Sequence, residues 1–166
     1  MSIPAGLKRT AAMVVLRAED HLLLLRRAKP PNQGLYVPVG GKVDPYEDPY
    51  QTALRETLEE TGIQLQQLHY AGSLVETSPV DYNWWCSIYV ADIPWQAPPL
   101  CDEGTLTWIP FDQLSKLPTP PTDWQIYQYI SRRQPFAMRA IYDADLHLLE
   151  MVEELEGIQV AFNIQL

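Results

Sequence analysis

The stretch Gly41 to Ile63, GKVDPYEDPYQTALRETLEETGI, decides the fold because it places one helix and a cluster of acids at a fixed point in the chain. Asp48 followed by Pro49 predicts a helix start. The Asp side chain can accept from unpaired backbone N–H groups, and Pro at the first helical position loses no hydrogen bond. Gly62 predicts the helix end. The sequence therefore predicts about four turns of helix between these signals.

The acidic residues of this helix gather on one face. At 3.6 residues per turn, Glu56, Glu59 and Glu60 lie together. Like charges at these spacings repel by roughly 0.2–0.5 kcal/mol per pair, which destabilises the bare helix. A divalent cation would reverse that effect, and carboxylate oxygens suit Mg²⁺ or Mn²⁺ better than zinc. The opposite face is expected to carry the less polar residues Tyr50, Leu54, Leu58 and Thr61.

The residues before the helix favour a ligand site over a solvated acidic face. Gly40 and Gly41 would let the backbone approach a ligand closely, and Lys42 adds positive charge beside the acids. Gly41 and Lys42 are therefore expected to contact substrate. Arg55 lies four residues before Glu59, close enough on a helix to hold that carboxylate, and it could also meet substrate.

These residues resemble the Nudix hydrolase box, G-x5-E-x7-R-E-U-x-E-E-x-G-U, in which U is usually a bulky aliphatic residue. Thr57 at the first U position is the one departure, and it leaves the carboxylates unchanged. The resemblance covers roughly Lys8 to Ser131 and implies an α/β fold, a three-layer α/β/α sandwich with a mixed β-sheet. The defining positions are filled by Gly41, Glu47, Arg55, Glu56, Glu59, Glu60, Gly62 and Ile63.

The resemblance implies hydrolysis of a nucleoside diphosphate linked to another group, X, by attack of metal-activated water on phosphorus. It implies that Glu56, Glu59 and Glu60, with the Gly40 carbonyl, bind Mg²⁺ or Mn²⁺. Glu59 is the first candidate for the base that takes the proton from water. Glu103, in the later loop CDEG, is the second candidate for a ligand or base, with an ordinary turn residue as the alternative.

Three basic residues and one acid are expected to support this centre. Glu47 and Arg55 are predicted to fix the box loop and helix around the catalytic group. Arg26 and Arg27 end a predicted strand beside the box loop. In similar proteins an Arg there meets phosphate, and a solvated strand end is the alternative.

Aromatic residues and one late acid are candidates for contacts with a base. Stacking on an indole contributes about 1–3 kcal/mol per base. Trp84 and Trp85 are adjacent on a predicted strand, so they point to opposite faces, and Trp84 is the one expected to bind substrate. Asp123 is either a helix N-cap or a carboxylate that hydrogen-bonds a purine edge. The other stacking candidates are Tyr82, Trp95 and Trp124.

Within the Nudix family, the chain most resembles the MutT-like 8-oxo-dGTP diphosphatases, through PVGGKVD before the box, Trp108 in WIPF and the pair Asp123-Trp124. The expected substrate is (8-oxo-)dGTP or a related nucleoside triphosphate, cleaved to monophosphate and pyrophosphate. Pro79, sixteen residues past the box, keeps ADP-ribose or another ADP-sugar as the alternative, and Tyr82 supports dinucleoside polyphosphates more weakly. A non-catalytic nucleotide sensor is the alternative of another class, and the intact acids argue against it.

Length and composition predict a single domain over residues 1–166. A hydrophobic share of 46% with 20% charged residues is ordinary for a globular protein. The net charge of −9 argues against nucleic acid as a partner and leaves a small nucleotide. The apolar run Ala11 to Leu16 is too short for a signal peptide or a membrane span. With Cys86 and Cys101 as the two thiols, a cytoplasmic, reduced protein is expected.

The remaining pattern predicts strands, a second helix and a C-terminal extension. Beyond a core of about residues 8–131, the extension of about 134–166 is predicted to form a β-hairpin, with Phe136–Tyr142 and Leu146–Val152 flanking a turn. This tail could close the core or build a homodimer. The other predicted elements are strands at Thr10–Leu16, Leu22–Arg27, Leu35–Pro38, Leu68–Val75, Trp84–Ala91 and Thr105–Ile109 and a helix at Asp123–Arg133.

Overall fold

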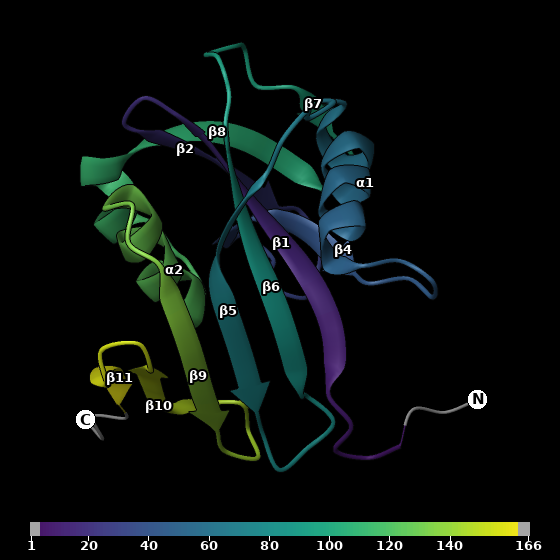
Figure 1. Cartoon of the computed structure of the whole chain (residues 1–166). Helices are drawn as coiled ribbons and strands as arrows, with labels where there is room; N and C mark the ends of the chain where they lie inside the picture. Colours follow the sequence, from purple (N-terminus) through teal and green to yellow (C-terminus); the bar gives the residue numbers. More distant parts are fainter. Residues whose placement is uncertain (1–3, 163–166) are drawn as a thin grey trace.

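A mixed β-sheet with a helix against each face makes up the described part of the chain, residues 4–162, in the computed structural model (Figure 1). Residues 1–3 and 163–166, the ends of the predicted domain and extension, lie outside this range. No helix among the described residues is long and apolar enough to cross a membrane. The helices are α1 (Pro49–Thr61), the 3-10 helix η1 (Phe111–Lys116) and α2 (Pro121–Ser131). The strands are β1 (Arg9–Ala18), β2 (His21–Arg27), β3 (Tyr36–Val37), β4 (Val39–Lys42), β5 (His69–Thr77), β6 (Trp84–Asp92), β7 (Leu100–Cys101), β8 (Gly104–Pro110), β9 (Phe136–Tyr142), β10 (Leu148–Glu153) and β11 (Ile158–Phe162).

Strand β1 has two partners on one of its edges. The order across the sheet is β11-β10-β9-β5-β6-β1-β2-β8-β7, with β3 beside β2. The pairs β1–β6 and β5–β9 are parallel and the other pairs are antiparallel. On one edge of β1, Leu16–Ala18 pair with β2, whereas Ala11–Val14 pair with β4. This change of partner places β4 where α1 contacts the sheet.

Two buried clusters, one on each face of the sheet, hold the helices. Alternation along β1 sends neighbouring side chains to opposite faces. Val14 and Leu16 belong to the cluster that includes Ala53 of α1. Val15 belongs to the cluster that includes Ile126 of α2. Burial of a side chain of this size contributes about 1.5–3 kcal/mol, so each helix is fixed by its own apolar layer. The predicted α/β/α sandwich is confirmed.

Both predicted ends of the box helix are confirmed. The Asp48 side chain accepts a hydrogen bond from the Gln51 N–H at 2.8 Å, and the Gln51 side chain accepts one from the Asp48 N–H at 2.9 Å. This reciprocal pair fixes the first turn. Gly62 ends the helix in the left-handed conformation, with φ of 72°, and its N–H donates to the Leu58 carbonyl.

The less polar face of α1 is not the face that packs on the sheet. Leu58, which shares that face with Tyr50, is 48% exposed. The face against the sheet consists instead of small residues, among them Ala53, Thr57 and Thr61. The Thr57 and Thr61 hydroxyls donate to carbonyls one turn earlier, at 2.8 and 2.6 Å, so they are buried without losing a hydrogen bond. Small side chains here bring the acids of α1 close to β4.

The remaining strands and the second helix lie close to their predicted positions, with five differences. Residues Gly40 to Lys42, expected as a loop, form β4. Helix α2 begins at Pro121, two residues before its predicted start. The short strand β7, the helix η1 and the strand β11 have no counterpart in the sequence-based prediction. Short elements of this kind are fixed by tertiary pairing rather than by their own pattern.

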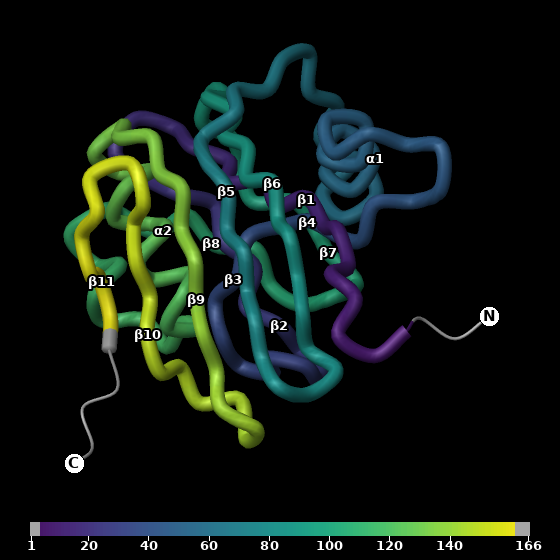
Figure 2. The backbone as a smooth tube through the Cα atoms, turned by 60° about the horizontal axis from the view of Figure 1, so that its bottom comes forward, coloured from purple at the N-terminus to yellow at the C-terminus, as the bar shows by residue number. Residues whose placement is uncertain are grey.

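The C-terminal extension closes the core by lengthening the sheet. Figure 2 shows β9, β10 and β11 side by side, beyond β5. The predicted hairpin is β9–β10, and it places Phe136, Met138 and Met151 in the buried cluster beneath α2. The buried carboxylate of Glu153 accepts backbone hydrogen bonds from Ala137 at 3.0 Å and from the next turn. Glu153 therefore ties β9 to the turn before β11.

Replacing Glu153 by Ala tests this anchoring. The change leaves three backbone N–H groups without their acceptor, and we expect the free energy of unfolding in urea to fall by roughly 2–4 kcal/mol. Glu156→Ala removes an exposed carboxylate from the same turn and serves as the matched control, with an expected change below about 0.5 kcal/mol. Equal unfolding midpoints for the two variants would contradict the anchoring role.

Candidate active site

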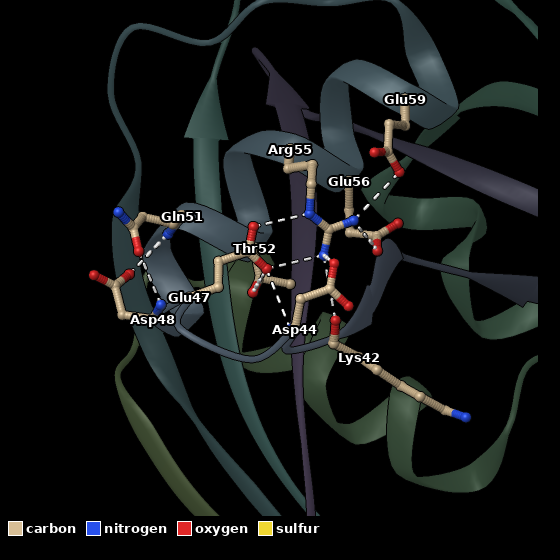
Figure 3. Close-up of polar contacts among 9 residues, drawn as sticks. All are labelled: Lys42, Asp44, Glu47, Asp48, Gln51, Thr52, Arg55, Glu56 and Glu59. Atoms are coloured by element: carbon tan, nitrogen blue, oxygen red, sulfur yellow. Dashed lines mark hydrogen bonds and ion pairs between the residues drawn. The ribbon is translucent and has the colours of Figure 1, made fainter.

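The guanidinium of Arg55 binds several carboxylates at once (Figure 3). Its Nε and Nη2 donate to the two oxygens of Glu47 at 2.8 and 3.0 Å, a bidentate pair. Its Nη1 donates to Glu56 at 2.7 Å and to Glu59 at 3.3 Å, and Asp44 lies 3.4 Å from Nη2. The single positive charge of Arg55 therefore neutralises only part of the negative charge of these carboxylates. Arg55 holds the box acids in place, as the sequence suggested.

Glu47 is held by Arg55 from one side and by the box loop from the other. The Thr52 hydroxyl donates to Glu47 at 2.7 Å, and the Asp44 N–H donates at 3.3 Å. The hydrogen bonds from Arg55, then that from Thr52, lower the pKa of Glu47 to about 2. Glu47 therefore stays ionised at neutral pH and ties the box loop to the helix.

Gly40 and Gly41 bring the backbone of β4 against β1 on one side and α1 on the other. A Cβ at position 40 would overlap the Ala12 carbonyl, and one at position 41 would overlap the Glu56 carboxylate. The Gly40 N–H donates to Glu60 at 3.4 Å. Lys42 is exposed, and its side chain extends away from Arg55 in Figure 3. The glycines thus permit a close approach of backbone to the acids, although in a strand rather than in a loop.

Glu60 is a partly buried box acid with other acids nearby. Burial, then the charge of Glu56, raises the pKa of Glu60 to about 7, and Glu103 acts in the same direction. The loop of Glu103 is held by a hydrogen bond from the Ala28 N–H to the Glu103 carbonyl at 2.9 Å. The Glu103 carboxylate lies 3.9 Å from the Arg27 guanidinium. The fold therefore brings Glu103 from a distant part of the chain to the box acids.

The donor set fits a hard divalent cation. Glu56 and Glu60 repel one another beside β4, and carboxylate oxygens are the ligands that Mg²⁺ and Mn²⁺ prefer. Glu59 lies farther out, with a side chain 58% exposed. The box carboxylates are not gathered tightly enough to bring three ligand atoms within 4.8 Å of one another. Among the described residues, one group outside the box meets that distance, in the turn between β9 and β10. That group is Asp143, Asp145 and His147.

A cavity of about 480 Å³ leads from the box loop into the molecule. Its volume lies in the range of small-molecule sites. Gly40 to Lys42 and Arg27 line one part of it, and Trp84 and Asp123 line another. Arg26 is exposed and does not line the cavity, because its neighbour on the strand takes the inward direction. The fold thus brings together most of the residues expected to bind substrate.

Asp123 is a cavity residue and not a helix cap. It lies inside the first turn of α2, whose N-cap is Pro120, and its side chain makes no capping hydrogen bond. The residue is 4% exposed. Burial, then the charge of Glu76, raises the pKa of Asp123 to about 8, so it is mainly protonated at neutral pH. The N-cap interpretation is wrong because Pro120-Pro121 begin the helix earlier.

Two residues of the cavity, Glu76 and Tyr142, were not assigned to it from the sequence. The Tyr142 hydroxyl donates to one oxygen of Glu76 at 2.7 Å, and the Tyr82 hydroxyl donates to the other at 3.2 Å. All three line the cavity, and Glu76 is buried. One signal was available for Glu76, since it lies two residues after the buried Leu74 on β5 and must share its face.

The other aromatic candidates lie elsewhere. Trp85 is exposed on the face opposite Trp84, as adjacent strand residues require. Trp95 stacks on Trp108, with ring centroids 4.9 Å apart. Trp124 packs against the cluster beneath α2. None of these four lines the cavity, so Trp84 and Tyr82 are the stacking candidates that the fold retains.

Comparison with known proteins identifies the family. The chain matches the NUDIX domain model over residues 6–130. It is 29% identical over 125 residues to the uncharacterized Nudix hydrolase YvcI of Bacillus subtilis, covering 72% of this chain and 77% of that protein. It is 31% identical over 110 residues to the NAD-capped RNA hydrolase NudC of Edwardsiella ictaluri, covering 64% of this chain and 40% of that protein.

Solved structures share the fold. A mutator MutT protein from Bacillus halodurans superposes with a TM-score of 0.77 at 23% identity, over 89% of this chain and 98% of that chain. The NUDIX domain of Shewanella oneidensis NrtR, solved with ADP ribose, gives a TM-score of 0.65 at 21% identity, over 76% of this chain and 88% of that chain. With the complete box and the family match, the chain belongs to the Nudix family and is a Nudix hydrolase, a pyrophosphohydrolase of nucleoside diphosphates linked to a second group.

Proposed function

We propose that the protein hydrolyses a purine nucleoside triphosphate, with 8-oxo-dGTP as the best candidate, to a monophosphate and pyrophosphate. The observation that carries this proposal is one cavity lined both by Gly40 to Lys42, where the box begins, and by the buried acid Asp123. Its charged end, near Gly41, Lys42 and Arg27, suits phosphates. Its other end offers the ring of Trp84 and a carboxyl group, which suit a base.

The box acids would hold the metal in this reaction. Glu56, Glu59 and Glu60, with the Gly40 carbonyl, are the proposed ligands of Mg²⁺, with Mn²⁺ as a second candidate. When bound, the ion would lower the pKa of water and neutralise charge on the phosphate oxygens. Glu59 is the proposed base for the attacking water, because its side chain is exposed and Arg55 restrains it.

Glu103 is the second candidate for a metal ligand or for the base that takes a proton from water. Its side chain faces Arg27, which lines the cavity, and its charge acts on Glu60. A residue placed in this way can reach either the metal or the attacking water without moving the box helix. Arg27 would contact phosphate in the same region, whereas Arg26 receives no such role.

The protonation state of Asp123 favours a particular hydrogen-bonding edge of the nucleobase. A protonated carboxyl group offers one O–H donor and one carbonyl acceptor side by side. The Hoogsteen edge of 8-oxoguanine presents the complementary pair, an O6 acceptor beside an N7–H donor, whereas guanine presents two acceptors there. At the Hoogsteen edge, Asp123 therefore favours 8-oxoguanine over guanine. An ionised carboxylate would accept only.

ADP-ribose is the runner-up substrate, and a nucleotide sensor is the alternative of another class. The solved NrtR domain binds ADP ribose, which keeps that ligand under consideration. However, Pro79, the residue that suggested an ADP-sugar, is exposed and does not line the cavity. Dinucleoside polyphosphates were suggested by Tyr82, which lines the cavity, and they are the weaker candidate. We further infer that the protein acts in the cytoplasm, where its two free cysteines would stay reduced.

A substrate panel tests the reaction. With Mg²⁺, we expect kcat/KM for 8-oxo-dGTP to exceed that for dGTP and ADP-ribose by about tenfold or more, because the acid of the cavity pairs with the oxidised edge. EDTA should abolish turnover and Mn²⁺ should restore it. Release of products is followed by chromatography. Preferential cleavage of ADP-ribose would retain the chemistry and reject the substrate, and binding without cleavage would favour a sensor.

Glu59→Gln tests the assignment of the base. Loss of a positioned base is expected to lower kcat by about 10²- to 10⁴-fold, with nucleotide binding retained. Steady-state kinetics on the preferred substrate measures the effect. The matched control is Glu156→Gln, an exposed residue far from the box in sequence, which should keep full activity. A normal kcat for the Glu59 variant would transfer the role to Glu103, where the same substitution should then be inactivating.

Asp123→Asn tests whether the buried acid is protonated. The unfolded chain loses this proton near pH 4, whereas the folded chain keeps it up to about pH 8, so the acid destabilises the fold increasingly as pH rises between these values. Asn has no proton to lose. We therefore expect the variant to melt at least about 3 °C above the wild type at pH 8, with the difference shrinking toward pH 5. Asp145→Asn, at an exposed site, should show no such trend.

A further inference from the structure

Part of the cavity wall comes from outside the matched Nudix domain. The family match ends at residue 130, yet Tyr142 and Leu146 line the same cavity as the box loop. Tyr142 is the last residue of β9, and Leu146 lies in the turn that follows. The C-terminal extension therefore contributes to the proposed substrate site as well as to the core.

Strand pairing determines where Tyr142 lies. β9 runs parallel to β5, with Ala140 opposite Glu76. Side chains two residues apart on a strand share a face, so Tyr142 projects from the same face as Ala140, one step beyond it. Its hydroxyl reaches Glu76 at 2.7 Å, and its ring meets the Tyr82 ring edge-on with centroids 5.6 Å apart. The contact is buried, so the geometry is fixed by packing.

Glu76 has several charged or titratable neighbours. Asp123 of α2 lines the same cavity as Glu76, and the charge of Glu76 acts on Asp123 and on Cys86 of β6. On the other side, the Lys8 ammonium donates to the Glu76 carbonyl at 2.6 Å. Burial raises the pKa of Glu76, and the hydroxyls of Tyr142 and Tyr82 oppose that rise. The two hydroxyls therefore support a charged Glu76 in a buried position.

Two buried carboxyl groups that line one cavity and whose charges act on one another do not both ionise readily. A charged Glu76 beside Asp123 favours a neutral Asp123, which can donate as well as accept a hydrogen bond. The Tyr142 hydroxyl thus influences the protonation of Asp123 indirectly, through its hydrogen bond to Glu76.

We propose that Tyr142 is a positioning residue for base recognition, and that the C-terminal extension thereby sets which nucleobase the cavity accepts. The proposal rests on the proposed function, since it assumes that the base binds in the part of the cavity lined by Glu76 and Asp123. Its ligand class is a purine that presents a donor and an acceptor side by side. Tyr142 touches no phosphate and takes no part in the hydrolysis.

The test is the binding of nucleoside monophosphates, which needs no turnover. Titration calorimetry gives Kd for 8-oxo-dGMP, dGMP and dCMP with the full chain and with Tyr142→Phe. The variant removes one hydroxyl and keeps the ring packed on Tyr82. We expect Kd for the preferred purine to rise about five- to tenfold, with Kd for dCMP unchanged. Tyr82→Phe, which removes the longer hydrogen bond, should change the same Kd in the same direction by a smaller factor.

Tyr129→Phe is the matched control. Tyr129 is also buried and packs edge-on against Phe136 of β9, but it does not line the cavity. Its variant should bind all three monophosphates as the wild type does. In turnover assays, kcat of Tyr142→Phe should stay within about twofold of the wild type while KM for the preferred substrate rises.

Two results would overturn the inference. One is an unchanged ratio of purine to pyrimidine affinity in both hydroxyl variants. The other is a wild-type protein that binds none of the three monophosphates. Base-selective binding that is lost in Tyr142→Phe supports the inference even if no triphosphate is cleaved, whereas that absence of cleavage would count against the proposed function alone.

Discussion

The excess of negative charge around Arg55 is the constraint on which the site depends. One guanidinium contacts Asp44, Glu47, Glu56 and Glu59, so the acids of the box are gathered but not neutralised. Their mutual repulsion must be offset by the rest of the fold. The capped first turn of α1, its small buried face and the close approach of β4 all serve to hold these charges in one place.

The cavity borders two acidic environments that differ in their exposure to solvent. At the box, carboxylates are partly exposed and arranged to attract cations and, with them, phosphates. At the other end, Glu76 and Asp123 are buried, and the low polarity of the surroundings makes the position of each proton decisive. A nucleotide spanning the cavity would therefore be held by charge at one end and by hydrogen-bond pattern at the other.

Sequence alone predicted the parts of the fold that local signals encode. Asp48-Pro49 and Gly62 delimit α1 within one short segment, and the acids of that helix share a turn. Trp84, Tyr82 and Asp123 were named from the sequence, but the contact between Tyr142 and Glu76 escaped prediction because the two residues are 66 positions apart. Only the strand order, with β9 parallel to β5, brings them together. Asp123 illustrates the same limit, since one residue pattern fits both a cap and a buried acid.

The parallel pairing of β5 with β9 also determines when, during synthesis, the protein could first select a nucleotide. The segment from β4 to the end of α1 is continuous, so the phosphate end can begin to form once that segment has left the ribosome. The base end cannot, because its last wall requires a strand made near the end of translation and a long loop closure. A nascent chain would therefore acquire a metal-binding surface before it acquires the means to choose a nucleotide.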